Sequence, residues 1–327
     1  MDRRKDRMKA IGPTSNGAVE RTLTRRLPAK AARVLSLYGW HYAFILIGVV
    51  FLFLFAYMPM LGLQIAFRDY KIHLGMWQSP WAGFKYFYFL TDGYFWQSFK
   101  NTILITGFRF LFGFPAPIVL AILLNEVRHS RFKRAIQSLS YLPHFISWIV
   151  VAYILYTMLA LDTGVVNLAV RTLGFPQVNF MGRPEYFRTI VVASAIWKEI
   201  GWGTIIFLAA IATIDPQLHE AAFLDGAGRF ARIRYINIPG MMPTVSILFI
   251  LSLPGIMNAG YEQIYPLVNP ANLEVSNVLD VYLIRLGLTQ AQYSVATAIG
   301  FMLAWINLVL VLIANWTIRR VGHVGLW

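Results

Sequence analysis

Six long apolar stretches constrain this 327-residue chain more than any other feature of its sequence. Crossing a hydrocarbon core of about 30 Å takes roughly 20 helical residues, and these stretches approach or exceed that length. Hydrophobic residues make up 57% of the chain and charged residues 13%, well below the roughly 25% charged that is usual in a soluble domain. We therefore expect an all-α, polytopic membrane protein with six transmembrane helices. The predicted spans cover residues 40–61, 102–124, 145–161, 189–214, 245–264 and 295–318.

The distribution of Lys and Arg predicts the orientation, because basic residues are retained on the cytoplasmic side of a membrane. With the N-terminus inside, cytoplasmic segments hold nineteen of these residues and outer loops hold eight, while Arg109 and Lys198 fall within spans. Both termini are therefore expected in the cytoplasm. The chain divides into a basic N-terminal tail (1–35), a transmembrane domain (36–320) and a short cytoplasmic tail (321–327). Residues 28–38 are predicted to form a helix on the inner membrane surface.

The formal net charge of +14 does not indicate a nucleic-acid partner. Basic residues beside membrane spans set the topology and attract anionic lipid headgroups, and the basic cluster at residues 3–9 lacks interleaved aromatic residues. We expect contact with membrane lipid and none with nucleic acid. The chain has no Cys, which excludes disulfides and thiolate metal sites.

A polar, glycine-containing segment between the fourth and fifth predicted spans has the features of a bent helical elbow outside the membrane. Asp215 followed by Pro216 is typical of a helix start, and Gly226 and Gly228 supply a backbone that can end the helix. A second short helix is predicted over about 230–236, after which the chain returns to the bilayer at Pro239. The topology places this elbow (residues 215–239) in the cytoplasm.

The spacing of the elbow resembles the motif of the inner-membrane permease subunits of ATP-binding-cassette (ABC) importers. Glu220, Ala221, Ala222, Gly226, Ile236 and Pro239 match it, and Ile238 stands where Leu is usual. The resemblance implies the type I importer permease fold and a coupling helix that docks in a groove of a cytoplasmic ATPase. The residues it assigns to ATPase coupling are Glu220, Ala221, Ala222, Asp225, Gly226 and Ala227.

Three further segments look like the carbohydrate branch of this family: residues 57–67, 99–102 and 142–148. They are most similar to the subgroup for oligosaccharides and polysaccharide fragments, which includes the larger permease of the bacterial alginate importer. The resemblance spans residues 35–320. It implies a second permease subunit, nonidentical to this one, two ATPase subunits, an external solute-binding protein, and a location in the bacterial plasma (inner) membrane.

The chain lacks the motifs that would make it an enzyme by itself. No Gly-Lys pair occurs, so a phosphate-binding P-loop is absent, and ATP with Mg²⁺ is expected on the partner ATPase. His219 and Glu220 could begin a zinc protease motif, but Phe223 stands where the second His would be needed. No G-x-S-x-G nucleophile motif is present either. We therefore expect no catalytic residue, metal or cofactor on this chain.

Charged residues inside spans are candidates for the substrate pathway, because their burial in a bilayer is unfavourable. These are Arg109, Lys198 and Glu199, and a cation here would suit an acidic sugar such as a uronate. Lys198 and Glu199 point about 100° apart on a helix, so they are not expected to pair only with each other. The alternative is that Arg109 and Lys198 extend to the headgroups or pair between helices.

Trp197 and Trp202 flank the two charged residues of the fourth span and could stack on sugar rings. The alternative is that they belong to the aromatic belts that line both faces of a bilayer. In the fifth span, Pro254 and Gly255 predict a hinge used in alternating access, with Asn258 close to the substrate path; the alternative is a static kink.

Two other functional classes are weighed against the importer. An ion-coupled secondary transporter would need buried carboxylates, and only Glu199 is suitably placed in a span. A membrane-embedded enzyme would need paired acids or a nucleophile, and the sequence shows no such group. The sequence therefore favours a permease subunit that moves an oligosaccharide, possibly acidic, by alternating access.

Overall fold

The computed structural model describes residues 29–320, so most of the predicted N-terminal tail and all of the C-terminal tail lie outside the described residues. The chain divides into two units, residues 1–61 and 62–327. The predicted all-α architecture is confirmed: the described residues contain only helices and one isolated β-bridge. Five of these helices are long and apolar enough to cross a bilayer, and a bent pair makes a sixth span.

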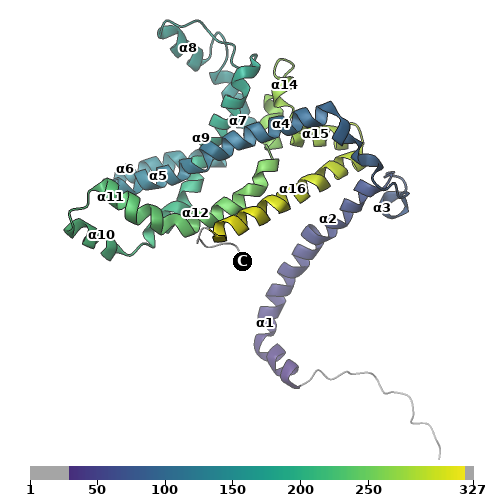
Figure 1. Cartoon of the computed structure of the whole chain (residues 1–327), viewed down its shortest axis with the longest axis horizontal. Helices are drawn as coiled ribbons and strands as arrows, with labels where there is room; N and C mark the ends of the chain where they lie inside the picture. Colours follow the sequence, from purple (N-terminus) through teal and green to yellow (C-terminus); the bar gives the residue numbers. More distant parts are fainter. Residues whose placement is uncertain (1–28, 321–327) are drawn as a thin grey trace, which may run out of the picture. The chain divides into compact units, whose positions relative to one another are not determined.

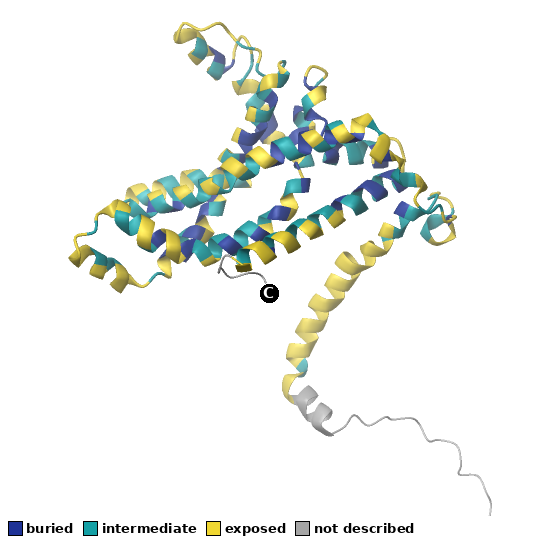
Figure 2. Cartoon of the chain, viewed as in Figure 1, coloured by how far each residue is buried: buried dark blue, intermediate teal, exposed yellow. Residues whose placement is uncertain are grey.

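The described part of the first unit is an apolar helix, α1 (Ala29–Leu52), which continues through η1 (Phe53–Tyr57) and α2 (Met58–Met60). The segment predicted to lie on the inner surface, residues 28–38, overlaps the beginning of this helix, and its place on the membrane surface stays a prediction. From Leu37 onward Figure 2 shows this helix almost entirely in the colour of exposed residues, and no side chain from Leu37 to Met60 is buried. Side chains this apolar need lipid or another chain around them.

The second unit holds the remaining long helices (Figure 1). The second span comprises α4 (Gly93–Phe108), η4 (Arg109–Gly113) and α5 (Pro115–Glu126), and the fourth is α9 (Pro184–Ala212). The fifth comprises α11 (Arg229–Arg232), η6 (Ile233–Asn237), α12 (Ile238–Ser252) and η7 (Leu253–Met257), and the sixth is α16 (Tyr293–Arg320). The second, fourth and sixth spans begin at least two residues before their predicted starts.

The predicted third span, residues 145–161, is wrong as a single straight helix. The structure has α6 (Ser130–Tyr141) with η5 (Leu142–Phe145), then α7 (Trp148–Met158), with an angle of 106° between the two parts. Pro143 opens the tight turn η5, and Ile146 and Ser147 are extended. Ser147 then caps the new helix, because its hydroxyl accepts a hydrogen bond from the Val150 amide at 3.4 Å.

The predicted fifth span, residues 245–264, and the separate short helix at 230–236 are also wrong. One continuous helix runs from Arg229 to Met257, so the second arm of the elbow is the start of the fifth span. The helix ends where Asn258 is extended and Gly260 has a φ of +86°. Short helices follow: α13 (Tyr261–Ile264), η8 (Tyr265–Leu267), α14 (Leu273–Ser276), α15 (Leu279–Ile284) and η9 (Arg285–Thr289).

Three π-helical turns explain how these long helices pass their prolines. Each ends two residues before a proline: η1 before Pro59, η4 before Pro115 and η6 before Pro239. Proline has no N–H, and its ring crowds the carbonyl four residues earlier. In all three cases that carbonyl lies inside the wider π-helical turn. The changed hydrogen-bond pattern of this turn accommodates the proline, so the helix continues.

The helix α9 is the centre of the second unit and packs against α5, α6 and α12. Two glycines allow the close contacts. A Cβ atom on Gly201 would lie 2.0 Å from the carbonyl oxygen of Ser140 in α6, and one on Gly203 would lie 2.9 Å from the ring of Pro117 in α5. Residues from the second and fourth spans and from α12 form one buried cluster there: Ala121, Phe207, Ala210, Ile211 and Met241. This packing holds the charged residues of α9 at fixed positions.

The outer loops carry η2 (Leu61–Phe67), α3 (Gly75–Gln78), η3 (Lys85–Thr91) and α8 (Val165–Thr172).

Candidate functional site

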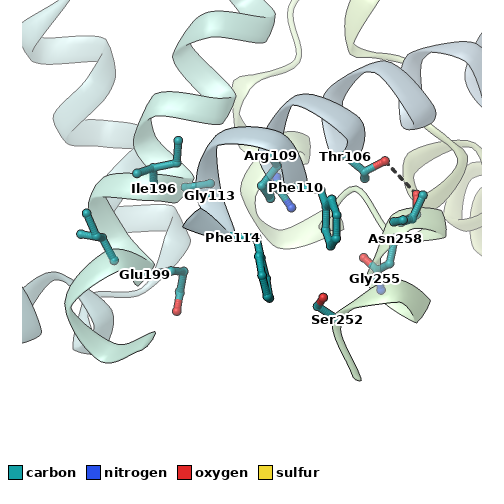
Figure 3. A pocket seen from close by; sticks show the side chains of 13 residues that line it. Thr106, Arg109, Phe110, Gly113, Phe114, Ile196, Glu199, Ser252, Gly255 and Asn258 are labelled. Carbon is teal, nitrogen blue, oxygen red and sulfur yellow. Dashed lines mark hydrogen bonds between the residues drawn. The ribbon is translucent and has the colours of Figure 1, made fainter. Parts of the chain in front are cut away.

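A cavity of about 300 Å³ lies between the second, fourth and fifth spans (Figure 3). It brings together four of the predicted pathway and hinge residues: Arg109, Glu199, Gly255 and Asn258. Most of its wall is apolar, including the rings of Phe110 and Phe114. A mostly apolar cavity with a few polar groups is the usual form of a small-ligand site.

Arg109 does not extend to a headgroup region but pairs between helices. Its Nη2 donates hydrogen bonds to the Ala259 carbonyl at 2.9 Å and to Gln263 Oε1 at 2.6 Å. Gln263 is itself held on α9, because its Nε2 donates to the Val191 carbonyl at 2.7 Å and to Ser194 Oγ at 2.9 Å. The structure therefore supports the alternative that Arg109 joins helices, while it also places Arg109 on the cavity wall.

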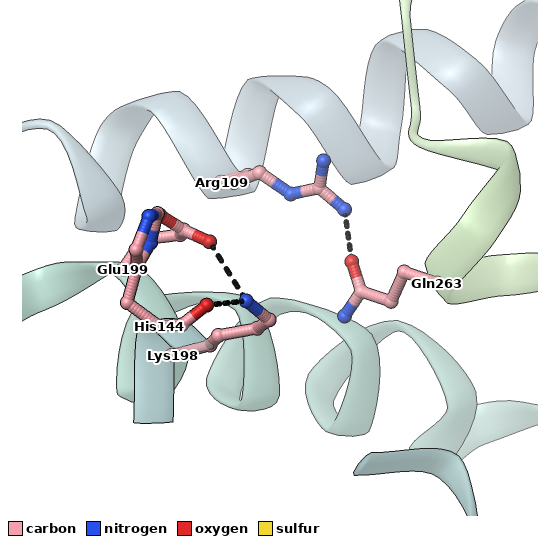
Figure 4. Close-up of polar contacts among 5 residues, drawn as sticks. All are labelled: Arg109, His144, Lys198, Glu199 and Gln263. Carbon is pink, nitrogen blue, oxygen red and sulfur yellow. Dashed lines mark hydrogen bonds and ion pairs between the residues drawn. The ribbon is translucent and has the colours of Figure 1, made fainter. Parts of the chain in front are cut away.

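Lys198 is likewise turned into the protein. It is only 5% exposed, and its Nζ donates to the His144 carbonyl at 2.6 Å (Figure 4). The Nζ also lies 5.3 Å from the ring centre of Trp148. Its Nζ is also 3.6 Å from Glu199 Oε1. Glu199 reaches the His144 ring as well, with 2.9 Å between Oε2 and Nδ1. Lys198 and Glu199 thus approach each other, and each also contacts His144, in line with the expected angle between them.

His144 is the residue that the sequence reasoning missed. It lies in η5, at the bend of the third span, and its ring stacks on Trp202 with 4.5 Å between ring centres and 3° between planes. The available signal was a lone His within the run 142–148, directly after Pro143. Its partners come from another helix, and the sequence could not indicate them.

The remaining predicted pathway residues lie outside the cavity wall. Trp197, Lys198, Trp202 and Pro254 do not line it. Trp197 and Trp202 are nearly half exposed, so sugar stacking on either stays a prediction. Pro254 and Gly255 lie in the tight turn η7, just before the break at Asn258. Their role as a hinge stays a prediction too.

The first arm of the elbow is a short helix followed by a glycine turn, as the sequence predicted. Its helix α10 (Pro216–Leu224) begins at Asp215, whose carboxylate accepts a hydrogen bond from the Gln217 amide at 2.9 Å. Gly226 follows the helix with a φ of +76°. Glu220, Ala221 and Asp225 are exposed, and Ala222 and Ala227 are half-buried.

The elbow also exposes large apolar side chains. Phe223 is 70% exposed and Leu224 is 85% exposed. Exposed apolar patches of this kind mark surfaces that contact another protein or lipid. The predicted ATPase-coupling residues therefore lie on a surface that is available to a partner.

The outer loops contain a carboxyl group, that of Asp69, whose pKa is shifted. The hydroxyl of Tyr86 donates a hydrogen bond to Asp69, which lowers the pKa of this carboxyl below its ordinary value. The pKa of Tyr86 is raised to about 12, mainly because the hydroxyl is partly buried and secondly because it makes this hydrogen bond. Among the residues that the structure describes, no group of three His, Asp or Glu side chains is placed to hold a metal ion.

These features define a class of protein: a polytopic helical membrane protein with a cavity between its spans and an exposed helical elbow. The chain belongs to the family of binding-protein-dependent transport system inner membrane components, whose model matches residues 113–323.

The relatives are of similar length to this chain. Protein LplB of Bacillus subtilis (strain 168) is 41% identical over 290 residues, which cover 88% of this chain and 91% of LplB. The polygalacturonan/rhamnogalacturonan transport system permease protein YteP of the same organism is 40% identical over 287 residues, covering 88% of this chain and 89% of YteP. A crystal structure of a bacterial ABC transporter involved in the import of the acidic polysaccharide alginate contains a chain with a TM-score of 0.82 and 39% identity, covering 89% of this chain and 99% of that one.

Proposed function

We propose that this protein is one of two nonidentical permease subunits of a bacterial inner-membrane ABC importer that carries an acidic, uronate-containing oligosaccharide. The observation that carries the acidic substrate is the guanidinium of Arg109 on the wall of the cavity. YteP, a polygalacturonan/rhamnogalacturonan permease, and the transporter for alginate both handle acidic polysaccharides, which supports the same chemistry.

The cavity suits a sugar chain in three respects. Phe110 and Phe114 offer ring faces for the apolar face of a sugar. Asn258 and Glu199 can exchange hydrogen bonds with hydroxyl groups. Arg109 can pair with a carboxylate in a bidentate manner, which adds geometric selectivity to the charge attraction. Among these groups, Arg109 is the one that favours a uronate over a neutral sugar.

The partners follow from what one chain supplies. The elbow is a single coupling surface and the cavity is lined by helices of one subunit, so a second permease subunit completes the pathway. Two cytoplasmic ATPase subunits bind ATP and Mg²⁺ and move the elbows, and an external solute-binding protein delivers the sugar. Closure of the ATPases turns the cavity outward by alternating access, and hydrolysis resets it. In this cycle the turn at Pro254 and Gly255 acts as the hinge of the fifth span.

Uptake into proteoliposomes tests this proposal. The complete importer, purified by a tag on this chain, is reconstituted with its solute-binding protein and supplied with a labelled oligogalacturonate or with the same oligomer after reduction of its carboxyl groups. We expect ATP-dependent uptake of the acidic oligomer and at least tenfold less of the reduced one, since loss of a charged hydrogen-bond pair is worth about 1.5–3 kcal/mol. Uptake that needs an ion gradient and no ATP would refute the importer, and equal uptake of both oligomers would refute the acidic specificity.

A further inference from the structure

The break between the fifth span and α13 is held in place by side chains from several helices. Ala259 is fully buried, and its carbonyl accepts the hydrogen bond from Arg109 on the second span. The Gly260 amide donates to Asp280 Oδ2 at 3.1 Å and to Asn258 Oδ1 at 2.9 Å. The left-handed conformation of Gly260 is thus fixed on one side by Asp280 and on the other by Arg109.

Only one of the three guanidinium nitrogens of Arg109 makes the hydrogen bonds that join the helices. Both hydrogen bonds run through Nη2, to Ala259 and to Gln263. Its Nε is buried and has no hydrogen-bond partner within residues 29–320. An unpaired donor on a buried charged group is unfavourable, so the observed state leaves part of the guanidinium unsatisfied. Figure 4 shows the side chain directed toward Gln263, and Figure 3 shows Arg109 among the residues that line the cavity.

The geometry of a guanidinium makes carboxylate binding compete with this arrangement. A carboxylate that binds in a bidentate manner uses Nη2 together with either Nε or Nη1, because only these pairs present parallel N–H bonds. An Nη2 group has two hydrogens, and both are taken here by Ala259 and Gln263. A substrate carboxylate that binds in this bidentate manner therefore has to displace at least one of these two acceptors.

Of the two hydrogen bonds that Arg109 makes, the one to the Ala259 carbonyl changes the structure most when it is broken. Gln263 stays attached to α9 through Val191 and Ser194 when Arg109 leaves it. The carbonyl of Ala259 has Arg109 as its side-chain donor at a fully buried position, and a buried carbonyl without a donor is unfavourable. Loss of Arg109 therefore drives the segment 258–260 to a new conformation.

We propose that Arg109 is a substrate-released latch: it holds the break at 258–260 while the cavity is empty, and a uronate carboxylate takes the guanidinium and frees the break. The latch couples occupancy of the cavity to the mobility of the fifth span, whose other end continues into the elbow. This inference rests on the proposed acidic substrate. Its alternative is that Arg109 is a permanent clamp that never exchanges partners.

Hydrogen exchange on the unmodified importer separates the two. With saturating oligogalacturonate, the amides of residues 258–264 are expected to exchange about tenfold faster, because local opening follows the lost hydrogen bonds. The carboxyl-reduced oligomer is expected to leave them unchanged. Unchanged exchange with the acidic oligomer under conditions where it is transported would overturn the latch without touching the proposed function; absence of transport of either oligomer would overturn the proposed function itself.

Substitution gives a second test with a matched control. Arg109→Gln is expected to raise the substrate-independent ATPase activity of the complex about tenfold and to speed exchange at 258–264 without any sugar. Arg188→Gln is the control, because Arg188 is also partly buried, donates to Asn101 Oδ1 at 3.2 Å and has an unpaired Nε, but does not line the cavity. If Arg109→Gln and Arg188→Gln give the same basal activity and the same exchange, the latch is refuted.

Discussion

Replacement of Gly226 tests whether the elbow transmits motion to a partner. Gly226 has a φ of +76°, and no atom lies within 4 Å of the position that its Cβ would take. Any other residue therefore meets backbone strain of about 1–2 kcal/mol but no clash within the chain. Gly226→Ala and Gly226→Leu should carry similar strain, so the two variants should insert and unfold alike.

The two variants should differ only when a partner covers the elbow. If the ATPase closes over Gly226, the Leu side chain has to be forced into that interface, and overpacking of this kind costs about 1–3 kcal/mol. The expected results for Gly226→Leu are binding to the ATPase subunits weakened by about tenfold or more and loss of transport. Gly226→Ala should keep most of both activities.

The measurements are thermal unfolding of the purified chain, recovery of ATPase subunits with a tagged permease, and ATP-dependent uptake in proteoliposomes. The unfolding curves show that both variants are folded, which leaves the difference in uptake to the interface. If Gly226→Leu transports as well as Gly226→Ala, the side of the elbow near Gly226 does not meet the ATPase and the proposed role is wrong.

Three further predictions test the fold, and the first of them has a matched control substitution. Gly201→Ala places a methyl group 2.0 Å from a backbone carbonyl oxygen and should destabilise the chain by about 3 kcal/mol. The control, Gly300→Ala, meets no atom within 4 Å and should be neutral or stabilising by up to about 1 kcal/mol. Equal melting temperatures of the two variants would contradict this prediction. Tyr86→Phe removes the hydrogen bond that lowers the pKa of Asp69 below 3.8. The ionised form is favoured in the folded state, so this stabilisation is present above pH 3.8 and is lost as the pH falls through the folded pKa. The melting temperature should drop at pH 7, and a difference that persists at low pH would contradict the assignment. Asp215→Ala removes the N-cap of α10 and so lowers the stability of the first helical turn by about 1 kcal/mol. Amide exchange in that turn should become about fivefold faster. Unchanged exchange would show that the cap is not formed.

Local signals account for the parts of the fold that the sequence predicted. Asp215 and Gly226 lie at the two ends of α10 as expected, because capping and left-handed turns depend on a few adjacent residues. The prolines were less informative. Pro239 was expected to end a short helix, but the π-turn before it lets the helix continue, and Pro143 lies at a bend of 106° whose size depends on how α6 packs on α9.

The sequence by itself determined the class of the protein: apolar stretches long enough to cross a bilayer, an orientation set by Lys and Arg, and an elbow with the spacing of a coupling helix. The tertiary structure decided the partners of the charged residues. Arg109 meets Gln263, which is 154 positions away in the chain, and Lys198 meets the carbonyl of His144, which is 54 positions away. Hydropathy and helical periodicity show only that a buried charge needs a partner, and the packing of distant helices determines which group that partner is.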